Sequence, residues 1–339
     1  MRILVTGGLG TVGAGLVSEL RNRSHHVVSC DIAHQPDEVG FSVPADVSGP
    51  VYARCDVGEF RQIERVIEHM GPFACVYHCA AEFGRWNGED FYETLWHTNA
   101  VGTKNVIRLQ ERLKFRLVHF SSSEVYGDWP EMMVETVMDD HEIKQLNDYA
   151  MTKWVNEMQV RNSILRYGTE SVVVRLFNTF GPGEYYSPYR SANCRILYCA
   201  LNGLPWTVFR GHSRTSTFLT DTVRTLANIV DNFRPGETYN IGGSQHHTIE
   251  ELSDAVLKVT GAPASLVRYK DSEPLTTRHK FVDVSKAIRD LGHQDTYSLK
   301  KGFASQPTGC AVCTTFEPTK RKMRPSKFRS SLRKMSADH

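Results

Sequence analysis

Two short motifs in this chain carry residues that can do acid–base chemistry. Tyr149 and Lys153 are four residues apart, and three consecutive serines, 121–123, precede them. On a helix, residues at this spacing lie one turn apart on the same face, so the lysine ammonium can lie beside the phenol. A neighbouring cation favours the phenolate and lowers the tyrosine pKa toward neutrality, as a tyrosine that exchanges protons requires. Such a pair also arises by chance on solvated helix faces, so the motif needs support from the elements around it.

The first residues supply that support, because they indicate a site for a dinucleotide. The apolar run 2–6 predicts a strand, and an amphipathic helix is expected over 14–23. The turn between them contains Gly7, Gly10 and Gly13. Without side chains, these residues let the backbone turn sharply and approach a pyrophosphate, while the helix N-terminus offers free N–H groups. A glycine-rich turn without a ligand is the alternative, but the strand before it and the helix after it favour the dinucleotide.

Asp31 ends the second apolar run, 26–31, and selects between two forms of the cofactor. A carboxylate at this place accepts hydrogen bonds from the adenosine ribose hydroxyls and repels a 2′-phosphate. No arginine is present in the residues that follow it, 32–34. We therefore expect NAD rather than NADP, with an ordinary strand-end aspartate as the alternative.

Length and composition set the scale of the molecule. The chain has 339 residues, 40% of them hydrophobic, which suits one nucleotide-binding domain plus a smaller lobe. No apolar run approaches the roughly 18 residues of a membrane helix, and Met1 leads directly into a strand, so neither a membrane anchor nor a signal peptide is expected. The eight cysteines have mostly apolar neighbours, which is typical of buried free thiols. These observations predict a cytoplasmic protein.

The net charge of +2 hides an asymmetry along the chain. Residues 320–334 hold eight Lys or Arg and no acidic residue, and +2 less these eight leaves −6 for the rest of the chain. The body of the protein is therefore not expected to bind nucleic acid. The stretch 303–339 lacks a helical apolar stripe and is expected to be a basic, disordered tail. A tether to nucleic acid or to a membrane surface, or a divergent terminus, are the interpretations open for it.

The order of strand-like and helical runs predicts an α/β fold. Apolar strand-like runs lie near 2–6, 26–31, 51–57, 74–81, 116–122 and 171–177, and the clearest helices are 60–70, 90–113 and 147–167. This alternation predicts a Rossmann-type, doubly wound parallel sheet, whose ligand lies beyond the carboxyl ends of the strands. We expect a large domain over 1–180 and a smaller α/β substrate-binding lobe over 181–302, with some of its segments returning to the large domain.

With these elements in place, the chain resembles the extended short-chain dehydrogenase/reductase family, specifically its NAD-dependent nucleotide-sugar epimerases and dehydratases, over about residues 1–302. The matching motifs are Gly7-x-x-Gly10-x-x-Gly13, Asp56-Val57, His78-x-Ala80-Ala81, Asn99-x-x-Gly102-Thr103-x-Asn105-Val106, Ser121-Ser122-Ser123-Glu124-Val125-Tyr126-Gly127, Tyr149-x-x-x-Lys153, Arg175-x-Phe177-Asn178, Gly181-Pro182-Gly183-Glu184 and Tyr239-Asn240-Ile241-Gly242. The resemblance also implies a homodimer formed through the two long helices, 90–113 and 147–167.

The resemblance assigns NAD binding to residues that follow several strands. It implies contacts by Gly7, Gly10 and Gly13 to the pyrophosphate, Asp31 to the adenosine ribose, Asp56 and Val57 to the adenine, Ala80 and Ala81 to the nicotinamide side and Lys153 to the nicotinamide ribose, with Asn99 and Tyr149 as further cofactor-binding residues.

A second set of residues is assigned to a nucleotide-diphosphate sugar. Ser122 matches the family's catalytic Ser/Thr, which hydrogen-bonds the sugar O4. Asn178 and Arg214 match residues that bond the diphosphate, and Arg278 resembles a second arginine of this kind. A fork-shaped guanidinium suits bidentate phosphate contacts. For Arg278, an ordinary surface arginine is the alternative.

The resemblance implies a reaction that begins by oxidation at the sugar C4. Tyr149, as phenolate, would take the proton of the 4-hydroxyl while C4 passes a hydride to NAD, giving a 4-keto sugar. Returning the hydride to the other face of the ring gives a 4-epimer, which is the outcome we expect. Loss of water, as in a dehydratase, or of carbon dioxide, as in a UDP-glucuronate decarboxylase, are the alternatives. A non-catalytic NAD-binding regulator is the alternative of another class, although intact Ser122, Tyr149 and Lys153 argue against it.

Glu124 bears on the choice between these outcomes. The family's 4,6-dehydratases carry an Asp-Glu pair after the catalytic threonine, whereas this chain has Ser123-Glu124, similar to UDP-glucuronate decarboxylases. The proposed acid is therefore missing while the position of the base is filled. Glu124 is either that base or a residue that orients the site by hydrogen bonding. Arg85, in a loop expected over the sugar, either meets an anionic group or is exposed.

Overall fold

The computed structural model describes residues 1–34 and 51–305. Most of the expected basic tail, with Cys310 and Cys313, lies outside the described residues. The other six cysteines are free thiols, as expected. No helix among the described residues combines the length and the apolar character that crossing a membrane requires.

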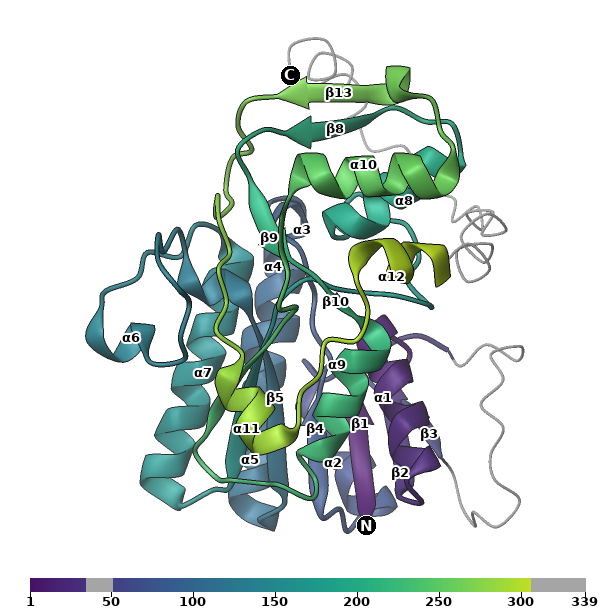
Figure 1. Ribbon diagram of the computed structural model, residues 1–339. Coiled ribbons are helices and arrows are strands. Elements are labelled where there is room, and N and C mark those ends of the chain that lie inside the picture. The colour runs from purple at the N-terminus through teal and green to yellow at the C-terminus, as the bar shows by residue number, and fades with distance from the viewer. Residues whose placement is uncertain (35–50, 306–339) are drawn as a thin grey trace, which may run out of the picture.

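A seven-stranded parallel sheet forms the centre of the large domain (Figure 1). Its order is β11-β6-β5-β4-β1-β2-β3, and every neighbouring pair runs parallel. The strands are β1 (Arg2–Thr6), β2 (His26–Asp31), β3 (Tyr52–Arg54), β4 (Cys75–His78), β5 (Arg116–Ser122), β6 (Ser171–Leu176) and β11 (Thr238–Ile241). The strand order reverses between β1 and β4, which is where doubly wound sheets bind their ligands. The predicted Rossmann-type sheet is confirmed, and β11 is a segment of the second half that returns to it.

Two layers of helices cover the two faces of the sheet, because alternate strand residues point to opposite sides. On β1, Ile3 and Val5 belong to one apolar core and Leu4 belongs to the other. The first core is closed by α1 (Thr11–Asn22), α9 (Leu219–Asn228) and α11 (Ser285–Leu291), and the second by α2 (Phe60–Met70), α5 (Gly102–Leu113) and α7 (Asp148–Tyr167).

Helix α7 presents the Tyr-x-x-x-Lys motif, and its ends are set by local chemistry. Asn147 is the N-cap, and its side-chain Oδ1 accepts a hydrogen bond of 2.8 Å from the amide of Ala150. Gly168 ends the helix in the left-handed region, with a φ of 61°, which glycine adopts without strain. Because the cap lies just before Tyr149, the tyrosine is held in the first turn of the helix.

The expected helix over 90–113 forms a continuous helical run that starts two residues later. It consists of α4 (Tyr92–Trp96), a π-helical turn (His97–Val101) and α5, and the separate short helix α3 (Arg85–Asp90) precedes it. Phe91 separates α3 from α4 because its φ of −138° and ψ of 54° are not helical. The apolar periodicity therefore located this helix along most of its length, and Phe91 sets where it starts.

The smaller lobe lies at the end of the sheet where the strands finish (Figure 1). Its core is formed by α8 (Ala192–Leu201), α10 (Ile249–Thr260), α12 (Leu299–Ser305), β8 (Trp206–Phe209) and β13 (Val267–Lys270).

The remaining elements of the described chain are α6 (Val137–Asp140), β7 (Thr179–Phe180), β9 (Ser213–Thr215), β10 (Thr217–Phe218), β12 (His246–Thr248) and two 3-10 turns, Ser123–Tyr126 and Ala264–Leu266.

Helix α12 continues past the expected start of the tail at 303. Phe303 is fully buried, and its ring centroid lies 5.1 Å from that of Phe180. Phe303 therefore belongs to the core of the small lobe, and the tail boundary expected at 303 falls inside α12.

Phe303→Ala should destabilise the small lobe by about 3–5 kcal/mol, because it removes a buried aromatic ring and leaves a cavity. Denaturant unfolding followed by tryptophan fluorescence, to which Trp206 in the same core contributes, measures the change. Lys300→Ala, at an exposed position of α12, is the matched control. Equal unfolding midpoints for the two variants would contradict the assignment of Phe303 to this core.

Candidate active site

A cleft of about 790 Å³ lies between the carboxyl ends of the strands and the small lobe. Most of the expected site residues line it: Gly7, Gly10, Gly13, Asp31, Asp56, Val57, Ala80, Ala81, Ser122, Glu124, Tyr149, Lys153, Asn178 and Arg214. The small lobe contributes Arg214 from β9, opposite the strand ends of the large domain. Asn99 and Arg278 are not among the lining residues that the structure describes.

The turn after β1 has the close packing that a dinucleotide cradle requires. Gly7 has a φ of +69°, and a Cβ there would lie 2.7 Å from the backbone nitrogen of Ala80. A Cβ on Gly13 would lie 2.1 Å from the carbonyl oxygen of Gly7. At the N-cap of α1, Gly10 has no side chain to bond the first N–H groups of the helix, so these groups can bond phosphate oxygens. The residues present therefore fit a dinucleotide.

Asp31 lies beside this turn at the end of β2. Its Oδ2 accepts a hydrogen bond of 3.0 Å from the amide of Leu9, and its Oδ1 accepts one of 3.1 Å from Ala33. Each carboxylate oxygen can accept a further bond, so ribose hydroxyls can be bound here. Asp56 is held in a similar way, since its Oδ1 accepts from the amide of Gly58 at 2.8 Å.

Asn99 lies behind the wall of the cleft. It is fully buried, its Oδ1 accepts from the amide of Glu82 at 2.8 Å, and its Nδ2 donates to Glu82 O and Thr152 Oγ1, each at 3.0 Å. These bonds connect the loop at Glu82, which lines the cleft, to α7. The structure thus places Asn99 as a support for this loop, away from the surface that a cofactor would contact.

Lys153 is buried one helical turn after Tyr149. Its Nζ donates a hydrogen bond of 2.8 Å to the carbonyl of Phe120 and lies 5.8 Å from the centroid of the Tyr149 ring. Burial lowers the pKa of Lys153 to about 8, against the opposing charge of the Glu157 carboxylate. The lysine can therefore lose or hold a proton close to neutral pH.

The pKa of Tyr149 differs in direction from the expectation. Burial raises it to about 12, a hydrogen bond with Ser122 lowers it, and the charge of Glu124 raises it. Desolvation outweighs the lowering influence of Ser122. The nearby ammonium of Lys153 is bound to a backbone carbonyl. Tyr149 is thus a phenol at neutral pH in the protein alone, and additional positive charge is needed beside it before it can accept a proton.

Ser122 and Glu124 are placed by the sharp turn after β5. Ser122 is the last residue of the strand and the N-cap of the 3-10 turn Ser123–Tyr126, and its Oγ accepts from the amide of Glu124 at 3.2 Å. The turn brings the Ser122 hydroxyl against Tyr149 and exposes Glu124 to the same cleft.

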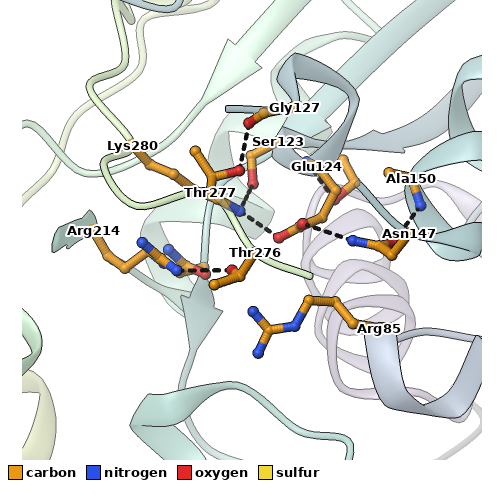
Figure 2. Close-up of polar contacts among 12 residues, drawn as sticks. Arg85, Ser123, Glu124, Gly127, Asn147, Ala150, Arg214, Thr276, Thr277 and Lys280 are labelled. Carbon is orange, nitrogen blue, oxygen red and sulfur yellow. Dashed lines mark hydrogen bonds and ion pairs between the residues drawn. The ribbon is translucent and has the colours of Figure 1, made fainter. Parts of the chain in front are cut away.

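Glu124 is paired with Lys280, a residue that the sequence analysis did not identify. Lys280 Nζ donates to Glu124 Oε1 at 2.5 Å and to Ser123 Oγ at 2.9 Å, while Asn147 Nδ2 lies 3.4 Å from Glu124 Oε2 (Figure 2). Lys280 lies 156 positions from Glu124 in the chain and belongs to no helix or strand. No spacing or periodicity in the sequence signals this pair.

The two expected phosphate-binding arginines are placed differently. Arg214 is buried at the cleft wall, where its Nη1 donates to the carbonyls of Ser213 (2.7 Å) and Arg278 (2.9 Å) and its Nη2 donates to Thr276 Oγ1 (3.0 Å). The side chain of Arg278 is exposed, and only its backbone takes part, so the surface arginine is the interpretation that the geometry favours. Arg85 is neither free nor fully exposed, because it forms an ion pair of 2.6 Å with Glu273.

Gly13→Ala should weaken NAD binding on the order of tenfold or more, because the new methyl group meets a backbone oxygen and the turn must open. NAD affinity measured by calorimetry tests this. Gly15→Ala is the control in the same helix, since its methyl group would meet the Val223 side chain at 3.1 Å and not the turn. An unchanged affinity in Gly13→Ala would show that the dinucleotide does not contact this turn.

Comparison with known proteins gives consistent results. A model of the NAD dependent epimerase/dehydratase family matches residues 3–242. The dTDP-glucose 4,6-dehydratase of Neisseria meningitidis is 28% identical, over 89% of this chain and 91% of that protein. The UDP-glucuronic acid decarboxylase 1 of Xenopus tropicalis is also 28% identical, over 89% of this chain and 70% of that one. The structure of epimerase Mth375 from Methanothermobacter thermautotrophicus superposes with a TM-score of 0.80 at 25% identity, over 92% of both chains. The chain therefore belongs to the NAD dependent epimerase/dehydratase family.

Proposed function

We propose that this protein is an NAD-dependent nucleotide-sugar 4-epimerase. One observation carries the proposal: Ser122, Tyr149 and Lys153 meet beside the dinucleotide cradle, while Glu124, the acidic side chain next to them, is bound to Lys280. The first set suffices for reversible oxidation at one sugar carbon. The second set lacks the free acid and base that a further elimination needs.

The side chains are placed to hold a sugar hydroxyl and move its proton. Ser122 and Tyr149 lie close to each other at the cleft surface, so a hydroxyl of the sugar can take a position between them. Bound NAD supplies the hydride acceptor and a positive charge on its nicotinamide ring. With that charge nearby, Tyr149 can release its phenolic proton to solvent; as phenolate it would then take the hydroxyl proton as C4 is oxidised and return it when C4 is reduced on the other face. The proton balance closes on Tyr149 alone.

Dehydration requires groups that this site does not offer freely. A base must remove the proton at C5 and an acid must protonate the departing C6 hydroxyl. Although burial raises the pKa of Glu124, the charges of Lys280 and Arg85 outweigh burial and lower it to about 2, which makes this carboxylate a weak base. Ser123, at the position expected for the acid, is a hydroxyl bound by Lys280. These contacts support epimerisation over elimination.

Decarboxylation of a nucleotide uronate is the second candidate. It needs no base, because a ketone at C4 lets the carboxylate at C5 leave as carbon dioxide. Arg85 and Arg214 line the cleft close enough to Glu124 to lower its pKa, so positive charge in this region can also hold a sugar carboxylate. Asn178, which also lines the cleft, and Arg214 suit the diphosphate.

We also infer a homodimer formed through α7 and its neighbouring helices. Met151, Met158 and Leu165 are exposed by 42%, 41% and 82% and recur every seven residues, so they form one stripe along α7. Large apolar side chains on one face of a helix are typical of helix packing between subunits. The cytoplasmic location expected from the sequence stays a prediction.

Tyr149→Phe should lower kcat by a factor of about 10² to 10⁴, because it removes the group that moves the proton and keeps the ring. Incubation with a panel of nucleotide-diphosphate sugars and NAD, followed by mass spectrometry and chromatography, measures turnover and product. The expected product has unchanged mass and a new retention time.

Tyr167→Phe, at an exposed position on the same helix, is the matched control, and NAD binding by both variants is measured in parallel. Loss of water from the substrate would make the protein a dehydratase, and loss of carbon dioxide a decarboxylase. Full turnover by Tyr149→Phe would refute the proposed role of this residue. Absence of turnover by the wild-type protein on every sugar would favour the non-catalytic regulator.

A further inference from the structure

Lys280 reaches the wall of the cleft from behind. Lys280 is only 1% exposed and does not line the cleft, whereas its two hydrogen-bond partners, Ser123 and Glu124, do line it. Figure 2 shows the ammonium directed at both partners, with Asn147 on the other side of Glu124. The lysine therefore acts on the cleft through the side chains in front of it.

We infer that Lys280 is a positioning residue that holds Glu124 as a carboxylate, aimed into the cleft as a hydrogen-bond acceptor for the sugar and withdrawn from proton transfer. This inference deepens the proposed function and rests on it, because the sugar is the ligand that Glu124 would meet.

The backbone around Lys280 is fixed on both sides. We use the name strap for residues 276–283. On the small-lobe side, the amide of Lys280 donates to the carbonyl of Ser213 at 3.2 Å. On the large-domain side, Thr277 Oγ1 donates to Gly127 O at 2.5 Å, and the strap carbonyl of Phe281 accepts from the amide of Met133 at 2.6 Å. These backbone contacts on both sides therefore restrict where the Lys280 ammonium can lie, in addition to the contacts of its side chain.

Several charged groups face Glu124, but they contribute in different ways. Arg85 and Arg214 extend toward the same space, and both lower the pKa of Glu124 at a distance (Figure 2). Their own hydrogen bonds go elsewhere, Arg85 to Glu273 and Arg214 to carbonyls and Thr276. Tyr149 is a neutral phenol in the protein without cofactor, and Asn147 is uncharged. Among the described residues, Lys280 is the cation in direct hydrogen-bond contact with Glu124.

Removal of Lys280 would leave the carboxyl group buried without a paired charge. Burial is the first influence on Glu124 and raises its pKa, and the cations outweigh it. Without the nearest cation, the carboxyl should bind a proton at higher pH and then donate a hydrogen bond where it previously accepted one. Since the folded pKa lies below the ordinary value, the pair stabilises the fold above that value, and its contribution is lost as pH falls toward 2.

The test is a titration of Glu124 in Lys280→Met and Lys280→Arg. Carbon NMR of ¹³C-labelled glutamate, compared with the matching Glu124→Gln protein, isolates the signal of this carboxyl group without any substrate. We expect a midpoint below about pH 4 in the wild-type protein. Lys280→Met should shift it upward by about 2 units or more, and Lys280→Arg, which keeps the charge, should shift it far less.

The pH profile of kcat/KM provides the functional readout. In Lys280→Met, kcat/KM should fall on the acid side of the profile as Glu124 becomes protonated. The fall should come mainly from a higher KM. The double variant Lys280→Met/Glu124→Gln should lack this acid limb, because no carboxyl group remains to titrate. A merely structural role for Lys280 would lower stability and leave the shape of the profile unchanged.

Three results would overturn the inference: a wild-type Glu124 that titrates above about pH 5, equal midpoints in the wild type and Lys280→Met, or an acid limb that persists in the double variant. If Lys280→Met fails to fold, the wild-type midpoint and that of Lys280→Arg still decide. Glu124 titrating as expected in a protein that turns over no nucleotide sugar would refute the proposed function and leave the charge-holding role of Lys280 standing.

Discussion

The buried ion pair between Arg175 and Glu157 is the interaction on which the active site depends. Arg175 Nε and Nη2 bind the two Glu157 oxygens at 3.0 and 2.7 Å, and both side chains are essentially inaccessible to solvent. Desolvating two charges is costly, and loss of one partner from such a pair typically costs about 3–5 kcal/mol. The pair joins β6 to α7 beneath the cleft. It thereby sets the helix that carries Tyr149 and Lys153 at a defined height above the sheet.

The same pair extends into a hydrogen-bond network that includes β5, which ends at Ser122, and β11. Ser121 Oγ donates to Glu157 Oε1 at 2.5 Å, next to the serine that lines the cleft. Arg175 Nη1 contacts the Tyr126 hydroxyl at 2.8 Å, and that hydroxyl donates to Asn240 Oδ1 at 2.7 Å on β11. The motif residues Arg175, Tyr126 and Asn240 are therefore buried scaffold. They keep Ser122 and Tyr149 in register without contacting a ligand, which separates two classes of residue that a motif alone does not distinguish.

Local features of the sequence predicted the parts of the site that local chemistry determines. Side chains at positions 7, 10 and 13 would meet backbone atoms that lie a few residues away or just after the adjacent strand. The position of α7 is explained by its capping residue and its length. Such features are encoded within a short window of the chain. The sheet and the cofactor cradle were therefore predictable before any coordinates existed.

The features that sequence reasoning missed depend on distant parts of the chain. Lys280 reaches Glu124 from a segment that belongs to no helix or strand and shows no periodicity. Asn99 forms its hydrogen bonds with the loop at Glu82, and the sequence motif around Asn99 does not indicate this contact. In the protein without cofactor the pKa of Tyr149 is raised, because desolvation of the phenol in the folded protein has the largest effect on it. Burial is a property of the assembled fold, and spacing in the chain does not report it.

The strap has a mechanical consequence. It is bonded to Gly127 and Met133 of the large domain, and it also receives Arg214 of the small lobe through the Arg278 carbonyl and Thr276. Any rotation of one lobe against the other must carry the strap with it or break these bonds. Arg214 and Glu124 are therefore coupled through the strap, so a movement of the small lobe would displace both of these cleft residues together.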